Sequence, residues 1–195
     1  VSGTLEASGK APSPLAGEGG GEGGLTGGHI QVTGQYVGLF NGAKVDVSGD
    51  AGGGTALIGG DFQGGNPDIR NALATFVGSD TTINADALTS GDGGKVILWS
   101  DGTTRVHGAI SARGAGGGSG GFVETSGRKY LEVTRTPEAG PGGTWLLDPE
   151  SITIAAAQAN ITQTAGAEGG AAETFAPAVA NTVTTINVAN INTAL

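Results

Sequence analysis

The sequence predicts an all-β solenoid, in which short strands stack coil upon coil. Glycine makes up 40 of the 195 residues and recurs at fixed places, four times as a Gly-Gly pair that opens an apolar run. An alternating apolar run that reaches a turn precedes each pair. Hydrophobic residues make up 37% of the chain, whereas aromatic residues make up 5% and methionine is absent. Repeated short strands with small apolar side chains are typical of a solenoid with a thin core.

The spacing of the runs predicts coils that tolerate insertions. Ile83 and Ile110 are 27 residues apart, and so are Val96 and Val123. These intervals fit a coil of about 20–27 residues. The earlier interval from Val45 to Ile83 is 38 residues, which leaves room for a loop or an extra strand.

Period-two alternation of apolar and polar residues defines the expected strands in order. They cover residues 4–7, 29–33, 36–39, 44–47, 55–58, 75–77, 82–85, 95–99, 104–106, 109–112, 122–125, 131–134, 151–154 and 183–188. Loop insertions are expected near 10–25 and 64–74. The first contains the flexible segment Pro12–Gly24. The second contains Asn66 and Pro67, which are common turn residues, and insertions on one face are where solenoids usually place binding surfaces.

The composition changes after residue 140, and this change divides the chain. Residues 1–140 are expected to form glycine-rich coils. Residues 141–195 are expected to continue the solenoid after the Gly-Gly-Thr-Trp-Leu-Leu-Asp-Pro run at 142–149. An Ala/Thr/Gly-rich excursion should leave the solenoid between 155 and 180, with at most a helical turn, because glycine and proline limit its helicity.

Charge and composition argue against several classes of function. The net charge is −9 and the sequence pI is about 4.5, which argues against binding nucleic acid or docking electrostatically on anionic lipid. Cysteine is absent, so the chain has no disulfide or thiolate metal site. No run approaches the length of a membrane-spanning helix, and no signal peptide is visible. Two ends without capping elements suggest a segment of a longer protein.

Each candidate site residue has a structural explanation that we favour. His29 and His107 are 78 residues apart, and no cluster of ligands surrounds either one. The Gly-x-Gly-x-x-Gly match that begins at Gly19 has no strand–helix context, and no nucleophile elbow is present.

Five aspartates could instead stack between coils into an acidic groove that binds Ca²⁺, although solvated turn residues are favoured. They are Asp46, Asp61, Asp86, Asp92 and Asp101. Trp99 and Trp145 could be platforms for stacking sugars, but packing in the core is favoured for both. We therefore expect no catalytic, cofactor-binding or metal-ligating residue.

Two stretches of the sequence resemble filamentous haemagglutinin-like adhesins, the large exoproteins of two-partner secretion in Gram-negative bacteria. The first begins at Gly59-Gly60-Asp61-Phe62-Gln63-Gly64 and runs to Ser100-Asp101, and the second is the 142–149 run. Together with Gly120–Gly127, the resemblance covers about residues 40–155. It implies a right-handed parallel β-helix, export through an outer-membrane β-barrel transporter, and a place at the cell surface. The N-terminal secretion domain of the family is not identified in the sequence, so the segment is interpreted as shaft.

The function expected from the sequence is a structural and adhesive stalk, not an enzyme, that attaches to host or matrix surfaces and has no cofactor and no membrane span. Two alternatives remain open. The segment could self-associate into extracellular filaments through open strand edges. It could also be a β-helical polysaccharide lyase or hydrolase, although its basic residues are too dispersed to favour this.

Overall fold

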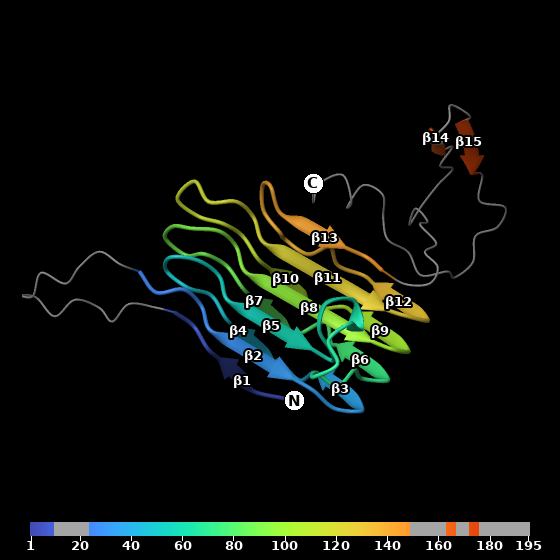
Figure 1. Cartoon of the computed structure of the whole chain (residues 1–195), viewed down its shortest axis with the longest axis horizontal. Coiled ribbons are helices and arrows are strands. Elements are labelled where there is room, and N and C mark those ends of the chain that lie inside the picture. Colours follow the sequence, from blue (N-terminus) through green and yellow to red (C-terminus); the bar gives the residue numbers. More distant parts are fainter. Residues whose placement is uncertain (10–23, 149–162, 167–171, 176–195) are drawn as a thin grey trace, which may run out of the picture.

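The computed structural model describes residues 1–9, 24–148, 163–166 and 172–175. Three parallel sheets form its body (Figure 1). The first sheet contains β1 (Thr4–Glu6), β4 (Lys44–Asp46), β7 (Thr82–Asn84) and β10 (Ala109–Ser111). The second contains β2 (His29–Val32), β5 (Thr55–Ile58), β8 (Lys95–Ser100), β11 (Phe122–Gly127) and β13 (Thr144–Leu146). The third contains β3 (Tyr36–Leu39), β6 (Ala74–Val77), β9 (Thr103–Val106) and β12 (Tyr130–Val133).

The chain visits the three sheets in turn, so that three consecutive strands make one coil. Strands β1–β3, β4–β6, β7–β9 and β10–β12 form four coils, and β13 belongs to the fifth. Thr103 pairs with Tyr130 and Lys95 pairs with Phe122, so coils three and four are in register at the expected 27 residues. The fold is a parallel β-helix, which confirms the predicted class.

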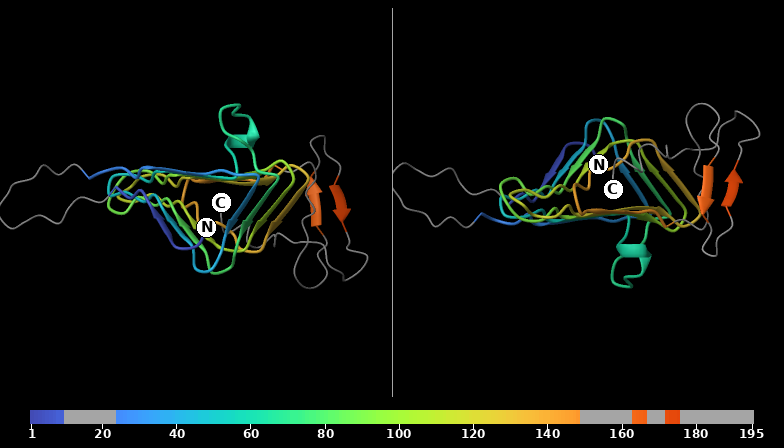
Figure 2. Two further views of the ribbon diagram at one scale, coloured as in Figure 1. Left: turned by 90° about the horizontal axis from the view of Figure 1, so that it is seen from below. Right: turned by 90° about the horizontal axis from the view of Figure 1, so that it is seen from above.

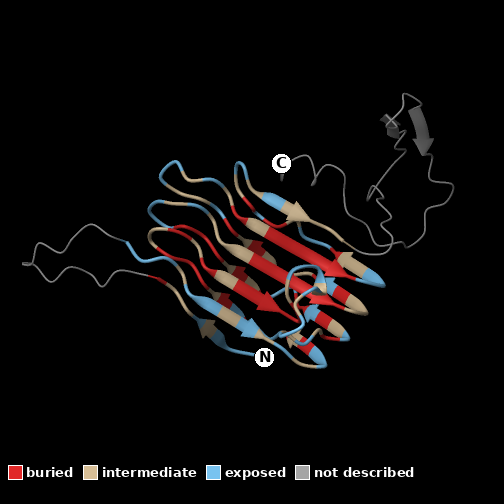
Figure 3. Cartoon of the chain, viewed as in Figure 1, coloured by how far each residue is buried: buried red, intermediate tan, exposed pale blue. Residues whose placement is uncertain are grey.

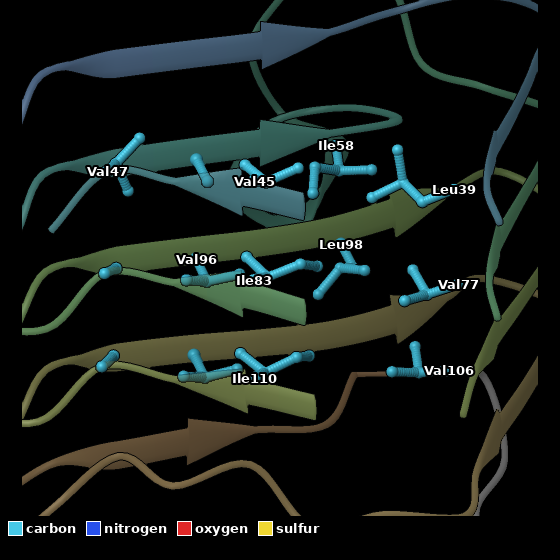
Figure 4. Packing of buried hydrophobic residues seen from close by; sticks show 14 of the residues in the cluster. Leu39, Val45, Val47, Ile58, Val77, Ile83, Val96, Leu98, Val106 and Ile110 are labelled. Atoms are coloured by element: carbon cyan, nitrogen blue, oxygen red, sulfur yellow. The ribbon is translucent and has the colours of Figure 1, made fainter. Parts of the chain in front are cut away.

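Aliphatic side chains stack on their counterparts in the next coil and fill the interior (Figure 4). In the first sheet, Val45, Ile83 and Ile110 are register partners and each is at most 3% exposed. In the second sheet, Ile58 pairs with Leu98, and both are fully buried. Figure 3 shows this burial repeated along the stack. The core therefore consists of aliphatic side chains stacked from coil to coil, and it is thin, as the composition predicts.

The Gly-Gly pairs allow two sheets to approach one another where the chain turns back. Gly94 donates its backbone N–H to the carbonyl oxygen of Ala85, 2.7 Å away in the same coil, while Gly93 donates to Ser119 in the next coil. A β-carbon on Gly94 would lie less than 3.0 Å from the carbonyl oxygen of Gly54. Side chains are thus excluded by the neighbouring backbone at this corner. The same bond within a coil is made by Gly28, Gly54 and Gly121.

The structure differs from the expected elements mainly near the C-terminal end. The apolar run around Trp145 forms strand β13, which the sequence analysis did not identify as a strand. Within the expected excursion, β14 (Gln163–Gly166) pairs antiparallel with β15 (Ala172–Phe175), and the rest of that excursion, with its possible helical turn, lies outside the described residues. The expected strands at 151–154 and 183–188, and the loop Pro12–Gly24 except its last residue, lie outside the described residues. The division at residue 140 stays a prediction.

Candidate functional site

The insertion after β5 is folded against the outer face of the five-stranded sheet. Residues 59–73, which we call the strap, project from that sheet and carry the short 3₁₀ turn η1 (Phe62–Gly64) (Figure 2). In Figure 1 the strap lies in front of β8, the central strand of the five-stranded sheet, which we call the long sheet. It is the largest departure from the repeat among the described residues, and inserted loops on a rigid scaffold often carry function.

Apolar side chains on the outer face of the sheet are buried beneath the strap. Alternation along β8 directs Val96 and Leu98 into the main core, whereas Ile97 and Trp99 belong to a second cluster with Leu57. Ile97 is fully buried and Trp99 is 3% exposed. The strap contributes Ile69 to this cluster, and Phe122 contributes from β11. The long sheet is therefore packed on both faces, which explains its uninterrupted apolar run at 96–99.

The tip of the strap, residues 61–66, reaches the fourth coil through aromatic contacts. The ring of Phe62 lies 5.8 Å from the ring of Phe122, and the Lys95 ammonium lies 5.6 Å from the Phe62 ring centre. Asp61 caps η1 by accepting a hydrogen bond from the backbone N–H of Phe62 at 2.7 Å. A hydrogen bond from the Asn66 side chain at 2.8 Å lowers the pKa of Asp61. The tip thus has a fixed shape held by a carboxylate.

Glu124 is a fully buried carboxylate beneath the tip of the strap. The backbone N–H of Gln63 donates to both of its carboxylate oxygens, at 3.2 Å each. Burial raises the pKa of Glu124, and the nearby negative charge of Asp148 raises it further. The side-chain amide of Gln63 also donates to Asp148 at 2.7 Å. One strap residue therefore bridges the fourth coil and the segment after β13.

The base of the strap is held by a polar group in the third coil. Asn71 donates to the carbonyl oxygen of Gly64 at 3.0 Å and to Asp101 at 3.2 Å. Asp101 also accepts from the Trp99 indole at 3.3 Å and pairs with Arg128 at 3.2 Å. The base of the strap is thus bonded to the third coil and its tip to the fourth.

A groove of about 450 Å³ lies at the corner where the strands of the long sheet begin. Its lining combines glycine backbone with a few side chains, including Lys95, Asp92 and Phe122. Glycine carbonyl groups in the lining accept hydrogen bonds from the next coil, as Gly54 does from Lys95 at 2.8 Å. These backbone groups are therefore already hydrogen-bonded within the fold. The side chains that line the groove are not arranged as a catalytic acid and base.

The structure does not bring the two histidines together. His29 is exposed on β2, in the long sheet, whereas His107 follows β9 in another sheet. The Nδ1 atom of His107 lies 2.9 Å from the Thr134 hydroxyl, and its Nε2 atom lies 3.7 Å from Glu132.

The five aspartates have separate structural partners. Asp86 accepts from the backbone N–H of Arg113 at 2.7 Å and forms an ion pair with its guanidinium at 2.8 Å. Asp92 accepts from the backbone N–H of Ser119 at 2.7 Å, and Asp46 accepts from that of Ser48 at 3.0 Å. Asp61 and Asp101 hold the strap. Within the described residues, no three His, Asp or Glu side chains gather in a way that could hold a metal ion.

The two tryptophans are placed differently. Trp145 packs against the main core and donates from its indole to the Thr125 hydroxyl at 2.9 Å. Trp99 is buried outside that core, under the strap.

Sequence reasoning identified the insertion but did not single out Glu124. Its outward position follows from the alternation Val123-Glu124-Thr125, whereas its partner in the strap is 61 residues away and leaves no local signal.

Comparisons with known proteins relate the chain to a bacterial secretion domain. The fold is similar to the crystal structure of the HMW1 secretion domain from Haemophilus influenzae, with 35% sequence identity and a TM-score of 0.53. The match covers 64% of this chain and 32% of that one, so this chain corresponds to about a third of the neighbour's length. No protein-family model matches the sequence, and comparison with curated proteins gives no match. No helix in the described part of the chain is long and apolar enough to cross a membrane. The chain is thus related in sequence and fold to a secretion domain.

Proposed function

We propose that the chain is a structural stalk segment of a large adhesive exoprotein, which a Gram-negative bacterium exports by two-partner secretion. The observation that carries the proposal is the in-register parallel β-helix, together with its 35% identity to the HMW1 secretion domain. In this proposal the segment has no catalytic role. It holds other parts of the exoprotein away from the cell.

The arrangement of hydrogen bonds suits a stiff stalk. Backbone ladders run from coil to coil in all three sheets, so bending the stack would strain many hydrogen bonds at once. Each coil adds about 4.8 Å, the spacing between paired strands. The chain contains no cysteine, so the stack needs no disulfide oxidation to form outside the cell. The strap adds a brace on one face.

The proposed partners follow from this role. An outer-membrane β-barrel transporter would export the parent protein, and host or matrix surfaces would bind it after export. End-to-end association of stalks into fibres, through their open strand edges, is a further part of the proposal. The net charge of −9 disfavours nucleic acid and anionic lipid as partners.

Surface labelling tests the proposal of export. Antibodies raised against residues 24–148 should label intact cells or the medium of the source bacterium. Inactivating the outer-membrane transporter should abolish the label while the protein remains detectable inside lysed cells. A periplasmic marker serves as the control for leakage. Detection only in the cytoplasm, with or without the transporter, would contradict export.

The likeness to a secretion domain favours one second candidate, in which this segment itself engages the transporter. An in-frame deletion of residues 4–148 from the parent protein distinguishes the two. A stalk segment can be removed with export retained and only attachment reduced. A segment that engages the transporter cannot, and its deletion would stop export altogether.

A further inference from the structure

The strap belongs to the second coil but is bonded to three later ones. Its base contacts Asp101 in the third coil through Asn71. Its tip contacts Glu124 in the fourth coil and Asp148 in the fifth through Gln63. The strap therefore spans coils two to five on the outside of the sheet, where no backbone ladder runs.

The contacts of the tip cannot form until the later coils are in place. The Gln63 backbone N–H and side-chain amide donate to Glu124 and Asp148, which lie 61 and 85 residues further along the chain. Phe62 likewise meets Phe122, which opens β11. By contrast, the strand that carries the strap, β5, pairs with β2 and β8. The second coil can therefore stack on its neighbours while the tip still lacks its partners in the fourth and fifth coils.

The tip also has an internal conformation that needs support. Gln63 has φ +52°, a backbone conformation that costs side-chain-bearing residues free energy. Asp61 and Asn66 hold the turn locally. The contacts with Glu124 and Asp148, together with the ring contact between Phe62 and Phe122, oppose opening of the tip away from the sheet.

We propose that residues 59–73 form a closing strap, whose tip docks only after the fourth coil and Asp148 are in place and then locks coils two to five together. Docking excludes water from Glu124 and completes the cover over Trp99. The lock holds the tip on the sheet over Glu124 and Trp99, while β5 itself stays paired with β2 and β8 through its own ladders. This inference concerns the order in which the chain folds and does not depend on export, because its contacts lie within the chain.

Hydrogen exchange on the full chain tests the lock at equilibrium. The variant Glu124→Ala removes the acceptor of the Gln63 backbone N–H, and Glu132→Ala is the matched control on another sheet. We expect the Gln63 amide to exchange about tenfold faster in Glu124→Ala, as loss of a hydrogen bond to a carboxylate implies, with β5 amides unchanged. Equal protection of Gln63 in both variants would overturn the proposal, and so would a matching loss of protection in β5.

A second variant keeps the test valid if Glu124→Ala does not fold. Asp148 is only half-buried, and Asp148→Ala removes just the acceptor of the Gln63 side chain. It should speed exchange in the strap in the same direction by a smaller factor. Unchanged exchange across residues 59–73 in this variant would count against the lock.

Pulse-labelled exchange during refolding of the full chain tests the order. The amide of Gln63 should gain protection together with or after the amides of β11, and later than those of β5. Protection of Gln63 before β11 would show that the tip docks without the fourth coil, and the proposed order would be wrong.

Discussion

Replacing Gly94 with alanine tests the explanation given for the Gly-Gly pairs. A β-carbon at this position would lie less than 3.0 Å from the carbonyl oxygen of Gly54 in the neighbouring coil. Accommodating it requires the two coils to separate at this corner. The hydrogen bonds at risk run from Lys95 to Gly54 at 2.8 Å and from Gly94 to Ala85 at 2.7 Å.

The expected loss follows from these two bonds. Leaving a buried backbone group without its partner costs about 1–3 kcal/mol, so Gly94→Ala should lower the free energy of unfolding by about 2–6 kcal/mol. Urea denaturation followed by far-ultraviolet circular dichroism measures this change.

Gly65→Ala is the matched control. Gly65 has φ −86° and ψ −4°, and an added β-carbon would meet only the Phe62 carbonyl oxygen at 3.6 Å. This variant should be neutral or gain up to about 1 kcal/mol, since alanine restricts the unfolded chain. If Gly94→Ala unfolds within about 0.5 kcal/mol of the original protein, a difference too small for the lost bonds, the argument from close approach is refuted.

Three further predictions concern the core, the buried carboxylate and the covered face. Ile83→Ala should lower the free energy of unfolding by about 2–5 kcal/mol, because the ladder cannot fill the cavity; urea denaturation measures the loss, and one below about 1 kcal/mol would contradict close packing. The raised pKa of Glu124, which faces Gln63, Ser126, Lys95 and Asp148, means that its effect on stability is most favourable at acid pH and becomes less so as pH rises through its folded pKa. The stability of Glu124→Gln relative to the original protein should therefore increase from pH 4 to pH 8, as urea midpoints would show. A decrease over this range would contradict the raised pKa of Glu124. Trp99→Ala should expose the strap to protease at Arg70 while leaving β9 protected, as limited trypsin digestion with mass spectrometry would show; an unchanged digestion pattern would contradict the cover.

Local pattern predicted the inward face of the fold well. Alternation placed Val45, Ile83 and Ile110 on one side of successive strands, and the constant 27-residue interval predicted the register of coils three and four. Both signals lie within or between adjacent repeats, where the side-chain period of two is enough to assign a face.

The outward face was harder to predict, because its burial depends on a segment outside the repeat. The run Val96-Ile97-Leu98-Trp99 has no polar alternation, which indicates burial on both faces, but it does not say what covers it. The strap supplies that cover, and its contacts with Glu124 and Asp148 join residues more than 60 positions apart. Strand β13 was missed because its apolar run is short and leads into Asp148 and Pro149.

Disulfide trapping tests the parallel, in-register stack most directly, since the chain has no native cysteine to interfere. Thr103 and Tyr130 are register partners on the outer face of neighbouring coils, about 4.8 Å apart and within the range that a disulfide spans. The account predicts that Thr103→Cys with Tyr130→Cys forms the crosslink readily under mild oxidation. The displaced pair, Thr103→Cys with Glu132→Cys, should not. Efficient crosslinking of the displaced pair, or failure of the first, would contradict the coil assignment on which the fold, the strap and the stalk all rest.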